Sequence, residues 1–453
     1  MKRSNRLVAR SAVALSLAAS LTACGTASST TTTAVSSEAA TETASETEAA
    51  STTENVGEDV WLPYNENLEK KRDDRDATGK NGAVASCNWY ASKAGLEILK
   101  EGGNAFDAAA AVAYTLGVAE PYFSGLGGGG FMTIYSAKDD KVSVLDFRET
   151  APAAANAQMW LDENGKMEQF SLDGVNNLGD KSVIGGLSVA VPGEVAGFEY
   201  LLDNYGSDAV SRQQIFQPAI DTANNGYVVG VTFKEELDSE YTGIAANETL
   251  SNIYLDESGL PYEVGDVIKN PDLAKTLQLI ADGGKDAFYT GDMAQAMVDA
   301  VAAWGGNMTM EDLANYEVKV REPVVGHYKD YTIYSLPPAS SGGTHLVEIL
   351  NILENYDDMD KIGVNSAEYV HRFSEAFKIA FADRAQYMAD TDFADVPLAQ
   401  LTSKDYAAER YSEITDKSGS YVAVEPEELE HYATTSFSVV DQWGNMVACT
   451  KTI

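Results

Sequence analysis

The glycine run Gly125–Gly130 lies between a helical pattern and a strand pattern, and this order restricts the folds open to the chain. The segment before it is rich in alanine, as in a buried helix, and Phe131–Tyr135 after it has strand composition. The run matches the G-x-G-x-x-G pattern of dinucleotide sites, but such sites need a strand before the glycines and a helix after them. The reversed order argues against nucleotide binding. We interpret the run as a crowded turn where backbone approaches backbone or ligand.

Helical and strand patterns alternate along the folded part of the chain. Asn104 is expected to cap a helix that runs to about Thr115, with Asp107 at its third position. The other predicted helices present these apolar faces: Ala91, Ala94, Gly95, Ile98 and Leu99; Leu346, Ile349, Leu350 and Leu353; Val370, Phe373, Phe377, Ala380 and Phe381. The predicted strands are Phe131–Tyr135, Val142–Phe147, Tyr331–Leu336, Phe437–Val440 and Met446–Thr450. This interleaving indicates a layered α/β (α+β) domain with much antiparallel pairing.

The charge of the chain argues against several classes of function. Acidic residues outnumber basic ones 69 to 32, which gives a formal net charge of -37. No nucleic-acid partner is expected, because phosphate binding needs clustered Lys and Arg. The few histidines and cysteines do not occur at zinc-ligand spacings, so no metal site is expected either.

Residues 1–23 have the features of a bacterial lipoprotein signal peptide. Basic residues precede the apolar run Ser11–Leu21, which is too short to span a bilayer, and Leu21–Cys24 resembles a lipobox in which Cys24 receives the lipid. Residues 24–56 contain this cysteine and a Ser/Thr/Glu-rich linker with too little apolar surface to fold. We expect an extracytoplasmic domain held at the cell membrane by a lipid anchor.

Residue chemistry alone suggests a threonine and an arginine as candidate functional residues. Thr434 opens the last hairpin after the polar segment Glu425–Ala433, which is typical of an exposed loop open to cleavage. A threonine freed by cleavage can be activated by its own α-amine, although most strand threonines are only β-formers. Arg148 follows a strand, either in an ion pair with Asp146 or Glu149 or as a bidentate clamp for a substrate carboxylate.

From Asn81 to the last residue, a series of motifs resembles the γ-glutamyltransferase (glutathione hydrolase) family. In family order they are GLGGGGF, DFRETAPAAA, AVPGEVAGFE, FYTG, EDL, SLPPASSGGTH, NILENYD, FADRAQYMADTDF and TTSFSVVDQWGN. The family is similar to the N-terminal-nucleophile hydrolases, so the resemblance implies a four-layer αββα sandwich. It also implies a precursor (zymogen) that cuts itself into a large and a small subunit that stay associated, and it implies no cofactor.

The resemblance gives each candidate residue a role. Thr434 matches the family's nucleophile, released by autocatalytic cleavage after Ala433. Thr452 matches the threonine that hydrogen-bonds this nucleophile, and Arg148 matches the arginine that holds the α-carboxylate of the γ-glutamyl group. The implied reaction cleaves the γ-glutamyl amide of glutathione and related compounds through a threonine-bound γ-glutamyl ester. Water, an amino acid or a peptide then takes the γ-glutamyl group.

The chain departs from the family pattern at its C-terminal end. The large subunit would comprise residues 57–433 and the small subunit only residues 434–453, without the family's oxyanion-hole glycines and α-amine-binding acidic residue. We expect a truncated sandwich with an unpaired strand edge at Phe437–Thr450, and weak or no activity of these residues alone. Ser436 stands where the family often has His.

Two cysteines, Cys87 and Cys449, are left outside these assignments. We expect buried, unpaired thiols that pack as small apolar groups. A disulfide between them is the alternative outside the cytoplasm.

Three functions remain open at this stage. The first is a surface glutathione hydrolase or γ-glutamyltransferase. The second keeps the fold and chemistry but acts as a poly-γ-glutamate depolymerase or transpeptidase, or as a β-lactam acylase. The third is a non-catalytic surface lipoprotein fragment.

Overall fold

The computed structural model describes residue 71 and residues 77–172, 175–421 and 434–453. The predicted signal peptide, Cys24, the linker and Ala433 lie outside these residues. The chain divides into Met1–Ala50 and Ser51–Ile453, and only the second unit contains described residues. Among the helices of the described ranges, none is long and apolar enough to cross a membrane.

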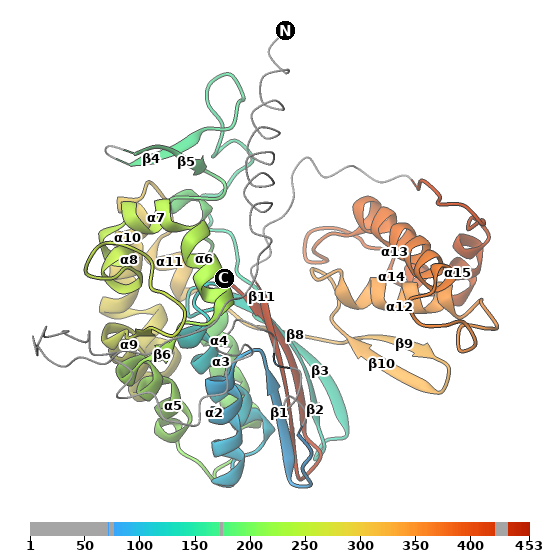
Figure 1. Cartoon of the computed structure of the whole chain (residues 1–453), viewed down its shortest axis with the longest axis horizontal. Helices are drawn as coiled ribbons and strands as arrows, with labels where there is room; N and C mark the ends of the chain where they lie inside the picture. Colours follow the sequence, from blue (N-terminus) through green and yellow to red (C-terminus); the bar gives the residue numbers. More distant parts are fainter. Residues whose placement is uncertain (1–70, 72–76, 173–174, 422–433) are drawn as a thin grey trace, which may run out of the picture. The chain divides into compact units, whose positions relative to one another are not determined.

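Helices and strands alternate along the chain, as the sequence patterns predict (Figure 1). The helices are α2 (Trp89–Lys100), α3 (Ala105–Ala119), α4 (Glu194–Tyr205), α5 (Arg212–Asn225), α6 (Val231–Ser239), α7 (Tyr241–Ala246), α8 (Glu248–Tyr254), α9 (Pro271–Tyr289), α10 (Gly291–Ala303), α11 (Met310–Ala314), α12 (Gly342–Leu353), α13 (Ala367–Tyr387), α14 (Leu398–Leu401) and α15 (Lys404–Tyr411). The strands are β1 (Gly82–Ser86), β2 (Gly129–Ser136), β3 (Lys141–Asp146), β4 (Gln169–Leu172), β5 (Val175–Asp180), β6 (Tyr227–Val228), β7 (Val267–Ile268), β8 (Lys319–Arg321), β9 (Val324–Tyr328), β10 (Tyr331–Ser335), β11 (Thr434–Asp441) and β12 (Met446–Thr452). The mixed α/β class is confirmed.

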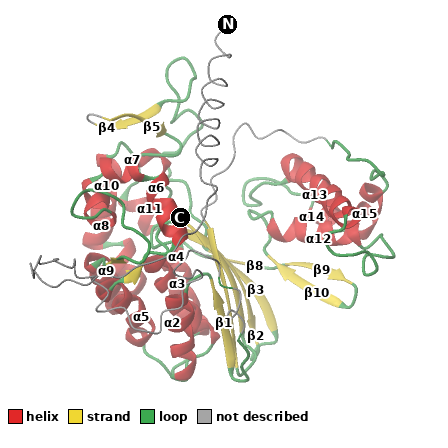
Figure 2. Ribbon diagram, in the orientation of Figure 1, coloured by secondary structure: helices red, strands yellow, loops and turns green. Residues whose placement is uncertain are grey.

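A six-stranded antiparallel sheet forms the centre of the fold (Figure 2). Its order is β1-β11-β12-β2-β3-β8, so β11 and β12 are both flanked by other strands. The expected unpaired edge at Phe437–Thr450 is therefore wrong. Strand β1, which no sequence pattern predicted, covers the outer side of β11, and its Ser86 pairs with Phe437.

Helices α2, α3 and α4 pack on one face of this sheet, against β1, β2, β11 and β12. Alanine side chains let α3 approach the strands closely, and its buried residues run from Ala105 to Ala119 almost without a break. The predicted cap is confirmed: the Asn104 side chain accepts from the N–H of Asp107, and the Asp107 carboxylate accepts from the N–H of Asn104. Of the four layers expected, the described residues show this helical layer and the six-stranded sheet.

The glycine run is a close backbone crossing, as the sequence analysis proposed. A Cβ atom on Gly128 would lie 1.9 Å from the carbonyl oxygen of Thr452, and one on Gly130 would lie 2.4 Å from that of Thr450. Only glycine allows β2 and the residue before it to lie this close to β12. The helix-glycine-strand order also holds, because α3 precedes the run and β2 follows it.

The apolar face predicted for 370–381 is confirmed only in part, at Ala380, which is buried, and at Phe373, which packs against the core. Helix α13 buries Glu375, Ala376, Ile379 and Asp383, whereas Val370, Phe377 and Phe381 are exposed in the described structure. Polar residues can occupy the buried face because they find partners: the Asp383 carboxylate accepts from Arg410 and from Tyr406. Leu346 on α12 is likewise 43% exposed, while Ile349 and Leu353 are buried as predicted.

Candidate active site

Thr434 and Thr452 lie directly opposite each other at one end of the β11–β12 hairpin. The turn between the strands fixes this register, because the backbone N–H of Trp443 and that of Asn445 each donate to Oδ1 of Asp441. Residues that face each other across an antiparallel pair have Cβ atoms about 4.5–5.5 Å apart. The two threonines that sequence reasoning singled out are therefore neighbours in the fold.

Both threonines project from the sheet face opposite the helical layer. In β11 the alternate residues Thr435, Phe437 and Val439 are buried, whereas Thr434 is exposed. In β12 the buried set includes Cys449 and Lys451, and Thr452 lies on the other side, half-buried. The same face carries an apolar hollow of about 420 Å³, lined by Ala85, Thr133, Ser438, Ala448 and other residues of the central strands.

Arg148 lies in the same cross-strand row as the two threonines. Thr452 pairs with Gly129 on β2, and Gly130 exchanges backbone hydrogen bonds of 3.3 and 3.0 Å with Phe147. Continuing this register by one residue sets Gly129 opposite Arg148. Three strand spacings then separate the backbones of Thr434 and Arg148, or about 14 Å. An arginine side chain can bridge much of that distance, so the sheet brings the candidate nucleophile and the candidate clamp to one edge region.

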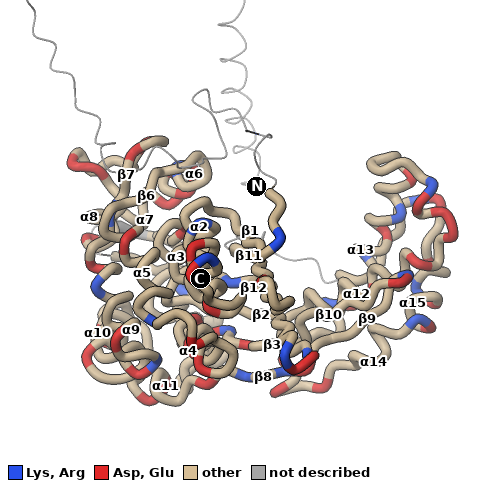
Figure 3. Tube along the Cα trace, turned by 90° about the horizontal axis from the view of Figure 1, so that it is seen from below, with Lys and Arg blue, Asp and Glu red and all other residues tan. Residues whose placement is uncertain are grey.

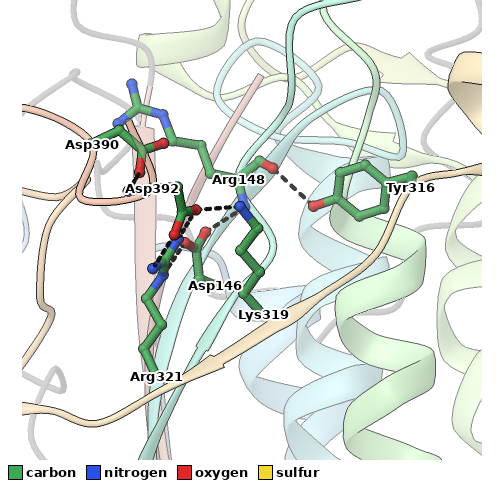
Figure 4. Close-up of polar contacts among 7 residues, drawn as sticks. All are labelled: Asp146, Arg148, Tyr316, Lys319, Arg321, Asp390 and Asp392. Carbon is green, nitrogen blue, oxygen red and sulfur yellow. Dashed lines mark hydrogen bonds and ion pairs between the residues drawn. The ribbon is translucent and has the colours of Figure 1, made fainter. Parts of the chain in front are cut away.

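The Arg148 guanidinium is exposed and forms no ion pair with any residue in the described ranges. Its backbone is held on both sides: its N–H donates to Asp146 Oδ1 at 3.1 Å, and its carbonyl accepts from the hydroxyl of Tyr316 at 2.8 Å (Figure 4). The Asp146 carboxylate pairs instead with Arg321. The structural ion pair considered for Arg148 with Asp146 or Glu149 is thus not formed.

A buried ion pair lies beneath Thr452, and sequence reasoning missed it. Lys451 Nζ donates to Glu194 Oε1 at 2.6 Å and to the carbonyl of Ala113 at 2.7 Å, and both charged side chains are 0% exposed. Burial raises the pKa of Glu194 to about 7, although the Lys451 charge opposes this. The signal was present in the sequence, because strand alternation places Lys451 on the side of Val447 and Cys449, which faces the core.

A second buried carboxylate anchors the start of β11. The Thr435 hydroxyl donates to Glu120 Oε2 at 3.1 Å, and burial raises the pKa of Glu120. Glu120 follows the last residue of α3, so this contact fixes the strand that carries Thr434 against the helical layer.

The described residues contain no cluster of three His, Cys, Asp or Glu side chains placed to hold a metal ion. Cys87 and Cys449 are both free thiols. Cys449 is buried as expected, and burial raises its pKa, whereas Cys87 is exposed, contrary to expectation.

Comparison with known proteins identifies relatives over most of the described chain. The family described as gamma-glutamyltranspeptidase matches residues 91–453. The glutathione hydrolase proenzyme of Escherichia coli (strain K12) is 41% identical over 378 residues, which cover 83% of this chain and 63% of that protein. The acylase ACY 1 proenzyme of Pseudomonas sp. (strain SE83) is 38% identical over 84% of this chain and 66% of its own length.

A solved structure gives the same result. The γ-glutamyltranspeptidase of Helicobacter pylori matches with a TM-score of 0.70 and 38% identity, over 76% of this chain and 95% of the other. The chain spans less than two thirds of the length of the curated relatives it matches.

Proposed function

This chain belongs to the gamma-glutamyltranspeptidase family, and on that premise we propose that its full-length gene product is a γ-glutamyl hydrolase and transferase. The proposed donors are glutathione and related γ-glutamyl amides, and the acceptors are water, amino acids or peptides. The observation that carries the proposal is the single row that contains Thr434, Thr452 and an unpaired Arg148. The chain's similarity to a glutathione hydrolase proenzyme at 41% identity and to a γ-glutamyltranspeptidase at a TM-score of 0.70 supports it.

Maturation is the first step we propose. The Thr434 hydroxyl attacks the carbonyl carbon of Ala433, and the acyl group moves from nitrogen to oxygen as the peptide C–N bond breaks. Water then hydrolyses the ester and leaves a new carboxylate on Ala433 and a free α-amine on Thr434. Ala433 lies outside the described residues, whereas Thr434 is exposed at the first position of its strand.

Catalysis then uses the same hydroxyl. The α-amine of Thr434 accepts its proton as the hydroxyl oxygen attacks the γ-carbonyl of the donor, and the amine product leaves with a proton. Water or an acceptor amine then attacks the carbonyl carbon of this γ-glutamyl ester; its C–O bond to Thr434 breaks, the γ-glutamyl group leaves on the acceptor, and the Thr434 oxygen takes back a proton. Thr452 orients the nucleophile from the neighbouring strand, and Arg148 binds the donor α-carboxylate through its two-pronged guanidinium.

The negative net charge of the chain makes the positive charge of Arg148 important for binding an anionic donor. Acidic positions are spread over helices α4–α11 and over the α12–α15 group (Figure 3), and the whole chain carries -37. An anionic donor therefore approaches against the overall field, and only a local cation offsets the repulsion. Added salt should screen this repulsion.

Substitution of Thr434 in the full-length gene product tests the proposal. Thr434→Ala should remain uncut on a denaturing gel and release 4-nitroaniline from γ-glutamyl-4-nitroanilide at the background rate. Ser438→Ala is the matched control, because Ser438 lies four residues along the same strand on the same exposed face. If Thr434→Ala released the product as fast as the parent, the assignment of the nucleophile would be wrong. An uncut and inactive parent would favour a non-catalytic surface lipoprotein.

The similarity to the Pseudomonas acylase supports a second candidate with the same nucleophile. A β-lactam acylase would release the acyl side chain of a β-lactam faster than it releases the γ-glutamyl group. A poly-γ-glutamate depolymerase would shorten the polymer instead. Measuring kcat/KM for the anilide, a β-lactam and poly-γ-glutamate with one preparation separates these three.

We also propose that Cys24 carries a lipid that anchors the protein outside the cytoplasm. Cells fed a labelled fatty acid should incorporate it into the parent and not into Cys24→Ala. The variant should also leave the membrane fraction. Cys87→Ala is the control, since that thiol lies within the folded part. Equal labelling of the parent and Cys24→Ala would contradict the anchor.

A further inference from the structure

Arg148 has an acidic competitor two residues before it on the same chain. Asp146 ends β3, and its Oδ1 accepts the backbone N–H of Arg148 at 3.1 Å. Residues two apart in extended chain project to the same side, so the carboxylate of Asp146 and the guanidinium of Arg148 are placed to attract each other. Asp146 is only 7% exposed, and water cannot screen such an attraction well. A pair between them would occupy the guanidinium that is proposed to bind the donor.

Arg321 binds the carboxylate of Asp146. It lies on β8 opposite Val144 of β3, and its side chain is 15% exposed. Its Nε donates to Asp146 Oδ2 at 2.6 Å, so both oxygens of Asp146 are in use, one on Arg321 and one on the N–H of Arg148. Close contact of this kind between a guanidinium and a carboxylate is among the stronger polar interactions in proteins.

A second carboxylate fixes the orientation of Arg321. Its Nη1 and Nη2 donate to the two oxygens of Asp392 at 3.1 and 2.7 Å, and Lys319 also contacts Asp392 (Figure 4). These contacts hold the pKa of Asp392 well below its usual range. In the same loop, Oδ1 of Asp390 accepts a hydrogen bond from the backbone N–H of Asp392 at 2.9 Å. The guanidinium of Arg321 is therefore held by two carboxylates, Asp146 at Nε and Asp392 at Nη1 and Nη2.

Arg148 itself stays outside this network. Its side chain extends away from the Asp146–Arg321 pair in Figure 4, and it forms no ion pair within the described part of the chain. The arrangement thus separates two arginines of different roles, one bound to protein carboxylates and one left unpaired.

We propose that Arg321 is a positioning residue for the donor site, which binds Asp146 and so keeps the guanidinium of Arg148 available for the α-carboxylate of the substrate. The inference rests on the proposed role of Arg148 in the γ-glutamyl reaction. It adds the requirement that a neighbouring carboxylate must be neutralised before Arg148 can serve. The ligand class is an α-amino acid carboxylate.

The test compares KM and kcat for γ-glutamyl-4-nitroanilide in the full-length gene product. Arg321→Gln should raise the donor KM about tenfold with a much smaller change in kcat, because ground-state binding is lost. Arg321→Gln combined with Asp146→Asn should return KM close to the parent value, since the competing charge is gone although Arg321 is still absent. Arg321→Lys should keep most of the donor affinity, because one ammonium still pairs with Asp146.

Asp392→Asn is the matched control for a purely structural role. It removes the other partner of Arg321 and leaves Asp146 paired, so the donor KM should rise far less than it does with Arg321→Gln. If Asp392→Asn raised KM as much as Arg321→Gln, and Asp146→Asn did not rescue Arg321→Gln, the positioning role would be overturned. Should Arg321→Gln fail to fold, the double variant decides alone, because it leaves no unpaired buried carboxylate: a KM near the parent value supports the inference, and a raised KM overturns it.

Arg148→Gln separates failure of this inference from failure of the proposed function. If Arg148→Gln leaves the donor KM unchanged, Arg148 does not bind the donor, and both ideas fail. If Arg148→Gln raises KM and Arg321→Gln does not, only the positioning role of Arg321 fails.

Discussion

Lys451 Nζ lies 2.6 Å from Glu194 Oε1, and both side chains are completely buried. The pair ties the N-terminal turn of α4 to β12 at the residue before Thr452. Glu194 Oε2 has no hydrogen-bond partner among the described residues. The contact with Lys451 therefore offsets most of the free-energy cost of burying this carboxylate. A buried carboxylate without a partner is costly, which makes each member of the pair necessary to the other.

Replacing one partner should therefore destabilise the protein strongly. Lys451→Met should lower the free energy of unfolding by about 3–5 kcal/mol, because Glu194 is left buried and unpaired. Lys451→Met with Glu194→Leu should recover most of this loss. The measurement is urea denaturation of each variant. Lys275→Met, on an exposed ion pair, is the control and should change stability by no more than about 0.5 kcal/mol. If Lys451→Met lowered the free energy of unfolding as little as the control does, another group would have to stabilise the buried Glu194 carboxylate.

The same carboxylate should make stability depend on pH. Its pKa is about 7 in the folded protein against about 4.5 for an ordinary glutamate, so the folded state keeps the proton over a range where the unfolded chain has lost it. The contribution is complete below about pH 4.5 and is lost as the pH rises through 7, by up to about 3 kcal/mol. Glu194→Gln lacks this titration. The stability of the parent relative to Glu194→Gln should thus fall between pH 5 and pH 8, and a constant difference would contradict the raised pKa.

The glycine crossing should not tolerate a methyl group. Gly128→Ala would place its Cβ 1.9 Å from the Thr452 carbonyl oxygen, a backbone atom that cannot move aside within a central strand. We expect a loss of about 3 kcal/mol or more, measured as the thermal midpoint together with soluble yield. Gly243→Ala in helix α7 has nothing within 4 Å of the new Cβ and should be neutral or stabilising by about 1 kcal/mol. Equal stability of the two variants would show that the backbone can separate at Gly128.

The role proposed for Thr452 depends on its hydroxyl rather than its shape. Thr452→Ser keeps the hydroxyl and should retain most of kcat for γ-glutamyl-4-nitroanilide, while Thr452→Val keeps the shape and should lose at least about tenfold, the equivalent of one hydrogen bond. The thermal midpoints of the two variants serve as the folding control. Similar kcat values for both variants would remove Thr452 from the site.

Local sequence patterns predicted the parts of the fold that depend on nearby residues. The cap formed by Asn104 and Asp107, the hairpin of β11 and β12, and the crowding of Gly125–Gly130 all follow from short spacings. The hairpin register also accounts for the pairing of Thr434 with Thr452, since both strands extend from one tight turn.

Long-range pairings could not be predicted in this way. Strand β1 lies beside β11 although some 350 residues separate them, and no local pattern states which distant strand will form the neighbour. The Arg321–Asp146 pair spans 175 positions and depends on the same sheet. The predicted face of α13 was wrong at Val370, Phe377 and Phe381 because the prediction assigned apolar residues alone to the interior, whereas Asp383 lies there with Arg410 as its partner.

The strand order β1-β11-β12-β2 also determines how the protein responds to a break in its chain. The two strands after position 433 are inserted between two strands that precede it, and backbone hydrogen bonds hold them on both sides. A chain cut at this point would form two polypeptides that share one sheet, with the strands of the second lying between strands of the first. Neither could be withdrawn without shearing two full rows of hydrogen bonds. We would therefore expect the fragments to separate only in denaturant, and the two pieces, expressed apart, to need folding together rather than docking as finished bodies.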